Sequence, residues 1–135
     1  MKIYVAAPWD DRYAAADAAK KLERAGHTIT HKWWDHESKL GDKGYDFPRE
    51  KLAKFALTDY FGVINADLVF LVNSAKSEGK AVEQGVALAE EKPIIAIGKL
   101  GEFKNIFHYL PNYFWFSTVD EGINAIEGVV AAWDN

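Results

Sequence analysis

Residues 66–98 decide the fold, and they read ADLVFLVNSAKSEGKAVEQGVALAEEKPIIAIG. An apolar run of strand length at 67–73 is followed by a loop, a segment of helical period, Pro93 and a second apolar run. Strands buried on both faces read as continuous apolar runs, and parallel strands need a helical crossover between them. The stretch therefore predicts a strand, a helix and a second strand parallel to the first.

The rest of the chain repeats this alternation in both directions. Further strands are predicted at 2–7, 27–33 and 113–116, and further helices at 12–25, 48–65 and 118–133. Gly26 stands where a glycine commonly ends a helix. Alternating strands and helices predict an α/β fold. We expect a flavodoxin-like, doubly wound sheet of five parallel strands in the order 2-1-3-4-5, with helices on both faces.

The composition sets the scale and the setting of the molecule. A chain of 135 residues with 49% hydrophobic side chains is long enough for one core, so we expect a single domain over 1–135. Cysteine is absent, which excludes disulfides and a thiolate nucleophile and removes the usual ligand of structural zinc. A reducing, cytoplasmic location is expected.

Several partner classes are disfavoured by the same composition. No apolar run approaches the roughly 20 residues that span a bilayer, and a strand pattern begins at Met1, so neither a membrane segment nor a signal peptide is expected. The formal net charge of −4 disfavours nucleic acid, which needs clustered Lys and Arg. A small-molecule substrate is the better prediction.

The predicted strand order also locates the ligand site. In doubly wound sheets ligands bind beyond the carboxyl ends of the strands, where the strand order reverses, here between the first and third strands. The loops that follow these strands, at 7–11 and 73–79, should line that crevice. Their candidate ligand contacts are Pro8, Trp9, Asn73, Ser77 and Gly79. The long charged loop at 35–48 is a candidate lid.

Glu83 is the first candidate catalytic residue. The helix that follows the third strand is predicted to pack on the sheet through Val82, Gly85, Val86 and Ala89, with Gly85 allowing a close approach. Glu83 lies beside this stripe, in the expected first turn, where the free N–H groups would keep its carboxylate ionised and aimed into the crevice. The ordinary alternative is an acidic residue that merely suits a helix N-terminus.

Asp59 is a second carboxylate in an unusual position. It interrupts the apolar stripe of the helix at 48–65, formed by Leu52, Phe55, Ala56, Tyr60 and Val63. A buried carboxylate needs a partner or stays protonated, so the alternatives are a salt bridge, a place at the edge of the stripe, or a functional role. One anionic and one protonated carboxyl in one crevice are what the cleavage of a glycosidic bond requires.

Several motifs resemble the nucleoside 2-deoxyribosyltransferase family over most of the chain. They are Lys2-Ile-Tyr-Val-Ala-Ala-Pro-Trp9, Thr58-Asp59, the run at 66–72, Gly79-Lys-Ala-Val-Glu-Gln-Gly-Val-Ala-Leu-Ala89 and Lys92-Pro-Ile-Ile. The resemblance implies that Glu83 attacks C1′ of a 2′-deoxyribonucleoside and that a second base resolves the covalent ester. It further implies that Tyr4 hydrogen-bonds Glu83, that Asp59 protonates the base, and that no metal or cofactor is used.

Ser77 departs from the transferase pattern. Six residues before the nucleophile the transferases carry an aspartate that holds the 5′-hydroxyl, whereas a related branch of 2′-deoxynucleoside 5′-monophosphate N-hydrolases carries serine there. A serine can donate a hydrogen bond to a phosphate that a carboxylate would repel. The acidic loop Ala7-Pro-Trp-Asp-Asp11 looks more like that of the transferases. Transfer is the first prediction, and hydrolysis of monophosphates is the alternative.

Other classes fit the sequence less well. A phosphorelay receiver domain needs an aspartate at the end of the third strand, where Asn73 stands. A dinucleotide-binding domain needs a Gly-x-Gly-x-x-Gly loop after the first strand, which is absent. A nucleotide-binding protein without catalytic activity stays open.

The remaining aromatic residues and histidines carry weaker predictions. His31 and His36 lack the spacing of a zinc-binding helix and are expected at the surface or against a base. Trp9 and Trp33 are candidates for an aromatic wall, with core packing as the alternative. The aromatic segment 107–116 is expected near a subunit contact, since the resemblance implies a homo-oligomer with shared active sites.

Overall fold

The computed structural model describes residues 1–36 and 47–134. Within them, five parallel strands form one sheet in the order β2-β1-β3-β4-β5. The strands are β1 (Lys2–Ala6), β2 (Thr28–Ile29), β3 (Leu68–Val72), β4 (Ile94–Ile97) and β5 (Tyr113–Phe116). The flavodoxin-like α/β fold and the strand order that the sequence predicts are confirmed.

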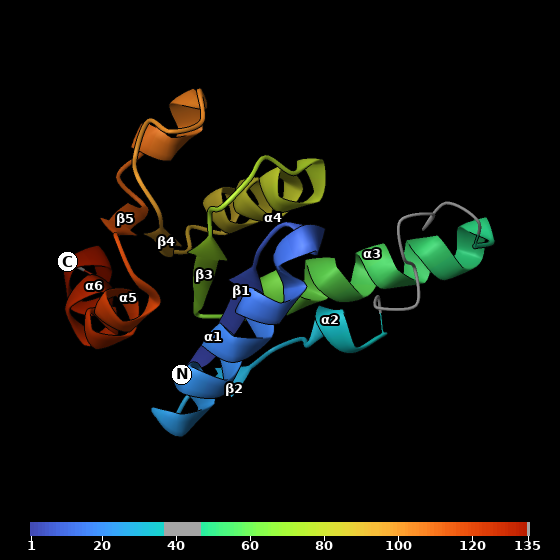
Figure 1. Cartoon of the computed structure of the whole chain (residues 1–135), viewed down its shortest axis with the longest axis horizontal. Helices are drawn as coiled ribbons and strands as arrows, with labels where there is room; N and C mark the ends of the chain where they lie inside the picture. The colour runs from blue at the N-terminus through green and yellow to red at the C-terminus, as the bar shows by residue number, and fades with distance from the viewer. Residues whose placement is uncertain (37–46, 135) are drawn as a thin grey trace.

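Helices cover both faces of this sheet (Figure 1). They are α1 (Arg12–Arg24), α2 (Trp33–His36), α3 (Arg49–Ile64), α4 (Glu78–Ala89), α5 (Val119–Asn124) and α6 (Ile126–Asp134), with 3-10 turns η1 (Trp9–Asp11) and η4 (Ile106–Tyr109). The helices α3 and α4 lie together on one face, and α1, α5 and α6 lie on the other. A salt bridge of 3.0 Å between Lys21 and Asp120 joins α1 to α5.

The central strands form the core because apolar side chains occupy both of their faces. Every residue of β3 is buried, and Phe70 is among the largest fully buried side chains. Burying a side chain of this size stabilises the fold by about 1.5–3 kcal/mol. At Gly122 of α5, a Cβ atom would lie 2.6 Å from Ile97 Cδ1 and 3.2 Å from Phe70 Cε2. Glycine is therefore required where α5 packs on the sheet.

Helix ends follow local sequence signals. Gly26 has a φ of 97° and lies just after the C-cap of α1, as predicted from its position. The Ser77 side chain accepts a hydrogen bond from the Lys80 backbone N–H and caps α4. Thr118 caps α5 through the Glu121 N–H.

Two predicted elements differ in extent. The second strand ends at Ile29, and Trp33, predicted to belong to it, begins α2. The Trp33 indole packs in the core and donates a hydrogen bond of 2.8 Å to the Val5 carbonyl, which turns the chain over the end of β1. The last predicted helix is divided at Ala125 into α5 and α6. The candidate lid at 35–48 falls largely outside the described residues.

Of the residues predicted to pack α4 on the sheet, Val86 contacts the core, and Val82, Gly85 and Ala89 are exposed. Lys80, Gln84 and Ala87 are the buried residues of α4, whereas Val82 is 65% exposed. Polar contacts determine which side of α4 faces the sheet. Lys80 Nζ donates a hydrogen bond to the Asn73 side chain, and the Gln84 side chain accepts one from the Tyr113 hydroxyl. A Cβ atom at Gly85 would meet nothing within 4 Å, so this glycine permits no close approach to the strands.

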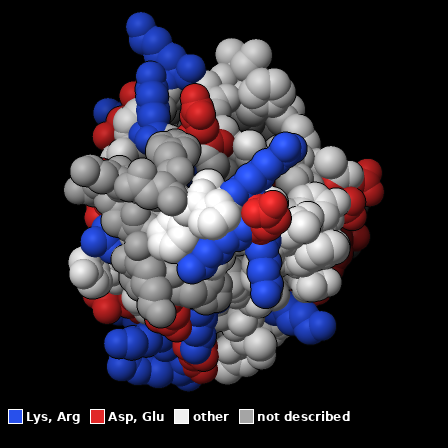
Figure 2. All heavy atoms as spheres, turned by 90° about the vertical axis from the view of Figure 1, so that its right-hand side faces the viewer, with Lys and Arg blue, Asp and Glu red and all other residues white. Residues whose placement is uncertain are grey.

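The surface agrees with a chain of mixed charge. On the face where α3 begins, Lys and Arg side chains are interspersed with Asp and Glu (Figure 2). No helix in the described part of the chain combines the length and the apolar character that crossing a membrane requires.

Candidate active site

Tyr4 and Glu83 meet on the face of the sheet that α3 and α4 cover. Tyr4 lies in β1 opposite Val69 of β3 and is fully buried. Its hydroxyl donates a hydrogen bond to Glu83 Oε2. Two residues that are 79 positions apart in the chain are thus joined at the switch point between β1 and β3.

The loops that follow β1 and β3 also meet there. Ser74 Oγ donates a hydrogen bond to the Asp11 carboxylate. The loops after β1 and β3 are thus joined where the strand order reverses, which is where the crevice is expected.

The predicted ionisation of Glu83 is wrong. Glu83 is the sixth residue of α4 and lies in its second turn, whereas the helix dipole acts mainly within the first. Burial raises the pKa of its carboxyl to about 8, and the nearby Asp59 adds to this rise. The Tyr4 hydrogen bond and Lys80 lower the pKa but only in part. Glu83 is consequently protonated at neutral pH.

Asp59 projects from α3 toward the same crevice and is half-buried. Its Oδ1 lies 3.2 Å from His31 Nε2, a charged pair when the imidazole is protonated. No group in residues 1–36 and 47–134 donates a hydrogen bond of good geometry to this buried oxygen. The residue that pairs with Asp59 is thus His31. The Oδ1 atom of Asp59 can also accept a hydrogen bond from a ligand.

Gly62 sets the distance between α3 and Tyr4. A Cβ atom at this position would lie 2.8 Å from Tyr4 Cδ2 and 3.0 Å from His31 Cβ. Thr30 Oγ1 donates a hydrogen bond of 2.7 Å to the Gly62 carbonyl and holds the helix in place. The position of the Tyr4 ring therefore depends on a glycine in α3.

Pro8 and Trp9 lie after β1, as predicted. Pro8 is buried and precedes η1, whereas Trp9 is half-buried. The Trp9 ring lies 6.2 Å from that of Trp33, and the Arg12 guanidinium lies 4.6 Å from the Trp9 ring. Trp33 is 5% exposed, so the alternative of core packing holds for Trp33, and Trp9 keeps the surface that could contact a ligand.

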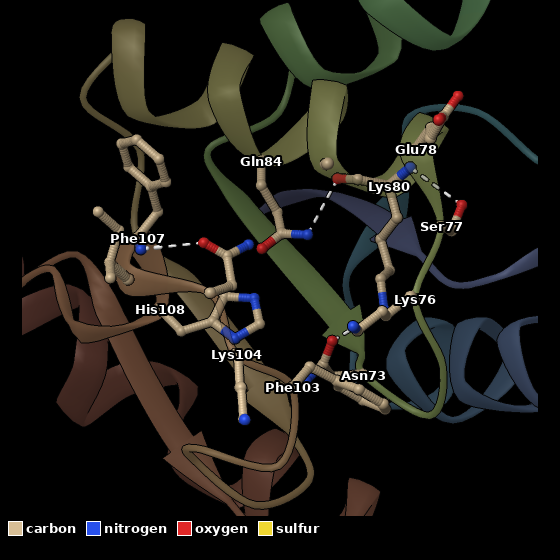
Figure 3. Close-up of a pocket in the computed structure, with 13 residues that line it drawn as sticks. Asn73, Lys76, Ser77, Glu78, Lys80, Gln84, Phe103, Lys104, Phe107 and His108 are labelled. Atoms are coloured by element: carbon tan, nitrogen blue, oxygen red, sulfur yellow. Dashed lines mark hydrogen bonds between the residues drawn. The ribbon is translucent and has the colours of Figure 1, made fainter.

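Asn73, Ser77 and Gly79 surround the N-terminus of α4. Asn73 is buried, and its Oδ1 accepts a hydrogen bond of 2.8 Å from Lys80 Nζ. Asn73 and Ser77 line a pocket of about 450 Å³ on the side of α4 that faces residues 103–108 (Figure 3). At Gly79 the nearest atom to a Cβ would be Ser77 Oγ at 3.9 Å, so the backbone is open to a ligand there.

The sequence analysis missed Lys80 and the role of His31. Burial lowers the pKa of Lys80 to about 8, although Asp11 and Glu83 both raise it. Helical spacing could have found Lys80, because it precedes Glu83 by three residues. Nothing in the sequence indicated that His31 would lie against Asp59.

The crevice offers acid–base and nucleophilic chemistry. It brings together a carboxyl with a raised pKa, a phenol bonded to it and a second carboxyl that lies against His31. Among the described residues, no three His, Cys, Asp or Glu side chains are grouped as metal ligands. Such a pair of carboxyls can supply a nucleophile and a proton donor.

Fold and site together define a class, a flavodoxin-like α/β protein with a buried Tyr–Glu pair at the switch point of its sheet. No protein-family model matches the sequence, and no curated protein matches it significantly. Among solved structures, the CMP N-glycosidase BcmB from Clostridium botulinum has a similar fold, with a TM-score of 0.57. The two are 18% identical, over 94% of this chain and 98% of that one.

Proposed function

We propose that this protein cleaves the N-glycosidic bond of a nucleoside or nucleotide, with Glu83 as the nucleophile. The observation that carries this proposal is the Tyr4–Glu83 hydrogen bond in the crevice between β1 and β3. The ionised Glu83 carboxylate forms a bond to C1′ of the sugar as the bond from C1′ to the base nitrogen breaks. Asp59 in its protonated form donates a proton to the departing base. Tyr4 orients the attacking carboxylate.

The acceptor of the sugar separates two candidate functions. The family resemblance supports 2′-deoxyribosyl transfer, in which a second nucleobase attacks C1′ and releases Glu83. The alternative is hydrolysis of a nucleoside 5′-monophosphate. Ser77 supports that alternative because its hydroxyl suits a phosphate, and so does the likeness of the fold to a CMP N-glycosidase.

Product analysis distinguishes these functions. The protein is incubated with deoxyinosine plus adenine and, separately, with nucleoside 5′-monophosphates that carry ribose or deoxyribose, and the products are separated by chromatography. Deoxyadenosine in the first mixture establishes transfer, whereas free base and a sugar 5-phosphate in the second establish hydrolysis. A protein that binds these compounds and leaves them intact would be a binding protein without catalytic activity.

The raised pKa of Glu83 predicts the pH dependence of cleavage. The reacting form has Glu83 ionised and Asp59 protonated, so the two carboxyls together carry one proton, and kcat/KM should fall as this proton is lost above about pH 8. Tyr4→Phe removes a hydrogen bond that lowers the pKa of Glu83, so the fall should move to higher pH. Asp59→Asn removes the proton donor, so cleavage should be slow and should instead rise with pH as Glu83 ionises. Rate profiles from pH 5 to pH 10 test these outcomes, and the same profile in all three proteins would contradict the assignment.

We also propose a homo-oligomer in which a neighbouring chain covers the crevice. Leu57 and Phe61 on α3 and Val82 on α4 are more than half exposed, and these two helices pack side by side. Apolar side chains grouped in this way favour burial against another chain. Light scattering should give a mass of at least two chains, falling toward one in Leu57→Asp. A monomeric wild type would contradict the proposal.

A further inference from the structure

The pocket beside the N-terminus of α4 is lined in part by Asn73 and Ser77, which are also candidate substrate contacts, and in part by residues that the proposed catalysis does not use. It lies between α4 and residues 103–108, and its volume of about 450 Å³ suits a small organic molecule. Gln84 and Lys80 point from α4 toward His108 and Asn73 (Figure 3). Tyr4, Glu83 and Asp59 are not among its lining residues.

The charged groups of the pocket favour an anion. Lys76, Lys80 and Lys104 line it together with one acidic residue, Glu78. Two N–H bonds of the Lys80 ammonium are used by Asn73 Oδ1 and the Ala75 carbonyl. Within residues 1–36 and 47–134, Lys80 forms no ion pair with a carboxylate. One N–H bond of the ammonium therefore remains for a ligand.

Two buried polar side chains point to a ligand independently of charge. Asn73 is 2% exposed and His108 is 4% exposed, and both line the pocket. Asn73 Nδ2 and His108 Nδ1 have no hydrogen-bond partner within the described part of the chain. Buried polar atoms are almost always bonded, so such a pair within one pocket indicates that another molecule completes their hydrogen bonds.

The apolar residues that line the pocket indicate the chemistry of the uncharged part of the ligand. Phe103 is half-buried beneath the Lys80 ammonium, which lies 5.7 Å from its ring, and Ile106 and Phe107 are exposed at the rim. A flat apolar group can pack against these side chains while an oxyanion meets Lys80 and Asn73. Three cations against one carboxylate favour a group with close to two negative charges at pH 7, as a phosphate monoester has.

We propose that this pocket binds the phosphate monoester of a small molecule with a flat apolar body, at a site separate from Glu83. Lys80 and the Asn73 amide hold the phosphate, Lys76 and Lys104 attract it, and the aromatic lining holds the apolar body. The proposal does not depend on N-glycosidic activity.

Phenyl phosphate is a suitable test ligand because it has the required charge and ring and has no N-glycosidic bond. Its binding to the full chain is measured by calorimetry and located by backbone amide shifts in NMR spectra, with inorganic phosphate and phenol for comparison. Phenyl phosphate should bind more tightly than inorganic phosphate, and phenol should show no saturable binding. The shifts should concentrate at Asn73, Lys80, Gln84 and residues 103–108.

Paired variants distinguish specific binding in the pocket from nonspecific attraction of the anion to surface lysines. Lys76→Gln with Lys104→Gln should weaken binding by about three- to ten-fold, because two exposed cations are lost from the pocket. Lys20→Gln with Lys54→Gln removes the same charge from exposed positions outside the pocket and should leave binding unchanged. Lys80→Met should weaken binding more than tenfold. If this variant does not fold, the result with Lys76→Gln and Lys104→Gln alone decides.

Glu83→Gln shows whether the pocket and the crevice are separate. Binding of phenyl phosphate should persist in this variant, including the shifts at residues 103–108. Equal weakening by the two lysine pairs, shifts centred on Tyr4 and Glu83, or no binding to the wild type would each overturn the proposal. A protein that binds phenyl phosphate and cleaves no nucleoside would retain this pocket and contradict only the catalytic proposal.

Discussion

Glu83→Gln is expected to reduce N-glycosidic cleavage by about 10³-fold or more, because the neutral amide cannot form the ester with C1′. Glutamine preserves the shape of the side chain and can still accept the Tyr4 hydrogen bond. The release of free base is followed with the substrate that the wild type cleaves best. Glu90→Gln, at an exposed position just after α4, is the matched control and should keep the wild-type rate.

The same substitution should stabilise the fold at alkaline pH. The folded pKa of Glu83 is about 8, above its ordinary value of 4.5, so the folded state binds the extra proton between these values. Its contribution to stability is therefore favourable at low pH and is lost as the pH rises through this window. Above pH 8, Glu83→Gln should increase the free energy of unfolding by on the order of 1–3 kcal/mol. Lost activity together with lost stability would instead indicate misfolding.

The sequence predicts the part of the site that rests on topology. Apolar runs give the strands, and the order of the strands brings the ends of β1 and β3 together, so Tyr4 and the helix that carries Glu83 must approach each other. A parallel sheet with buried faces is a strong pattern, because few other arrangements bury such continuous apolar runs. The prediction of the Tyr4–Glu83 contact also needed the family resemblance, since periodicity does not identify hydrogen bonds.

The sequence does not predict what depends on buried polar contacts. The apolar stripe of α4 suggested that Val82 faces the sheet, but Lys80 and Gln84 occupy that face because Asn73 and Tyr113 bond to them there. A hydrophobic pattern treats a lysine as exposed, whereas a long side chain can bury its stem and place its ammonium against carbonyl oxygens. The raised pKa of Glu83 was missed for a similar reason. The pKa rises because residues distant in the chain bury Glu83, whereas the local sequence indicates only that Glu83 lies near a helix N-terminus.

Gly62→Ala is expected to destabilise the protein by about 1–3 kcal/mol and to reduce cleavage at least tenfold. The added methyl group would lie 2.8 Å from Tyr4 Cδ2, so either α3 or the Tyr4 ring must move, and the hydroxyl that orients Glu83 moves with the ring. Chemical denaturation gives the first effect and the rate of base release gives the second.

Gly128→Ala is the matched control for this prediction. Gly128 lies in α6, where a Cβ atom would meet nothing within 4 Å, so alanine there should stabilise the protein by about 0.5–1 kcal/mol and leave cleavage unchanged. Both substitutions exchange glycine for alanine within a helix, so the gain in helix propensity is shared. The difference between them isolates the contact with Tyr4. If Gly62→Ala were stabilising to the same degree and fully active, α3 could shift freely against β1, and Tyr4 would not be held in place by this helix.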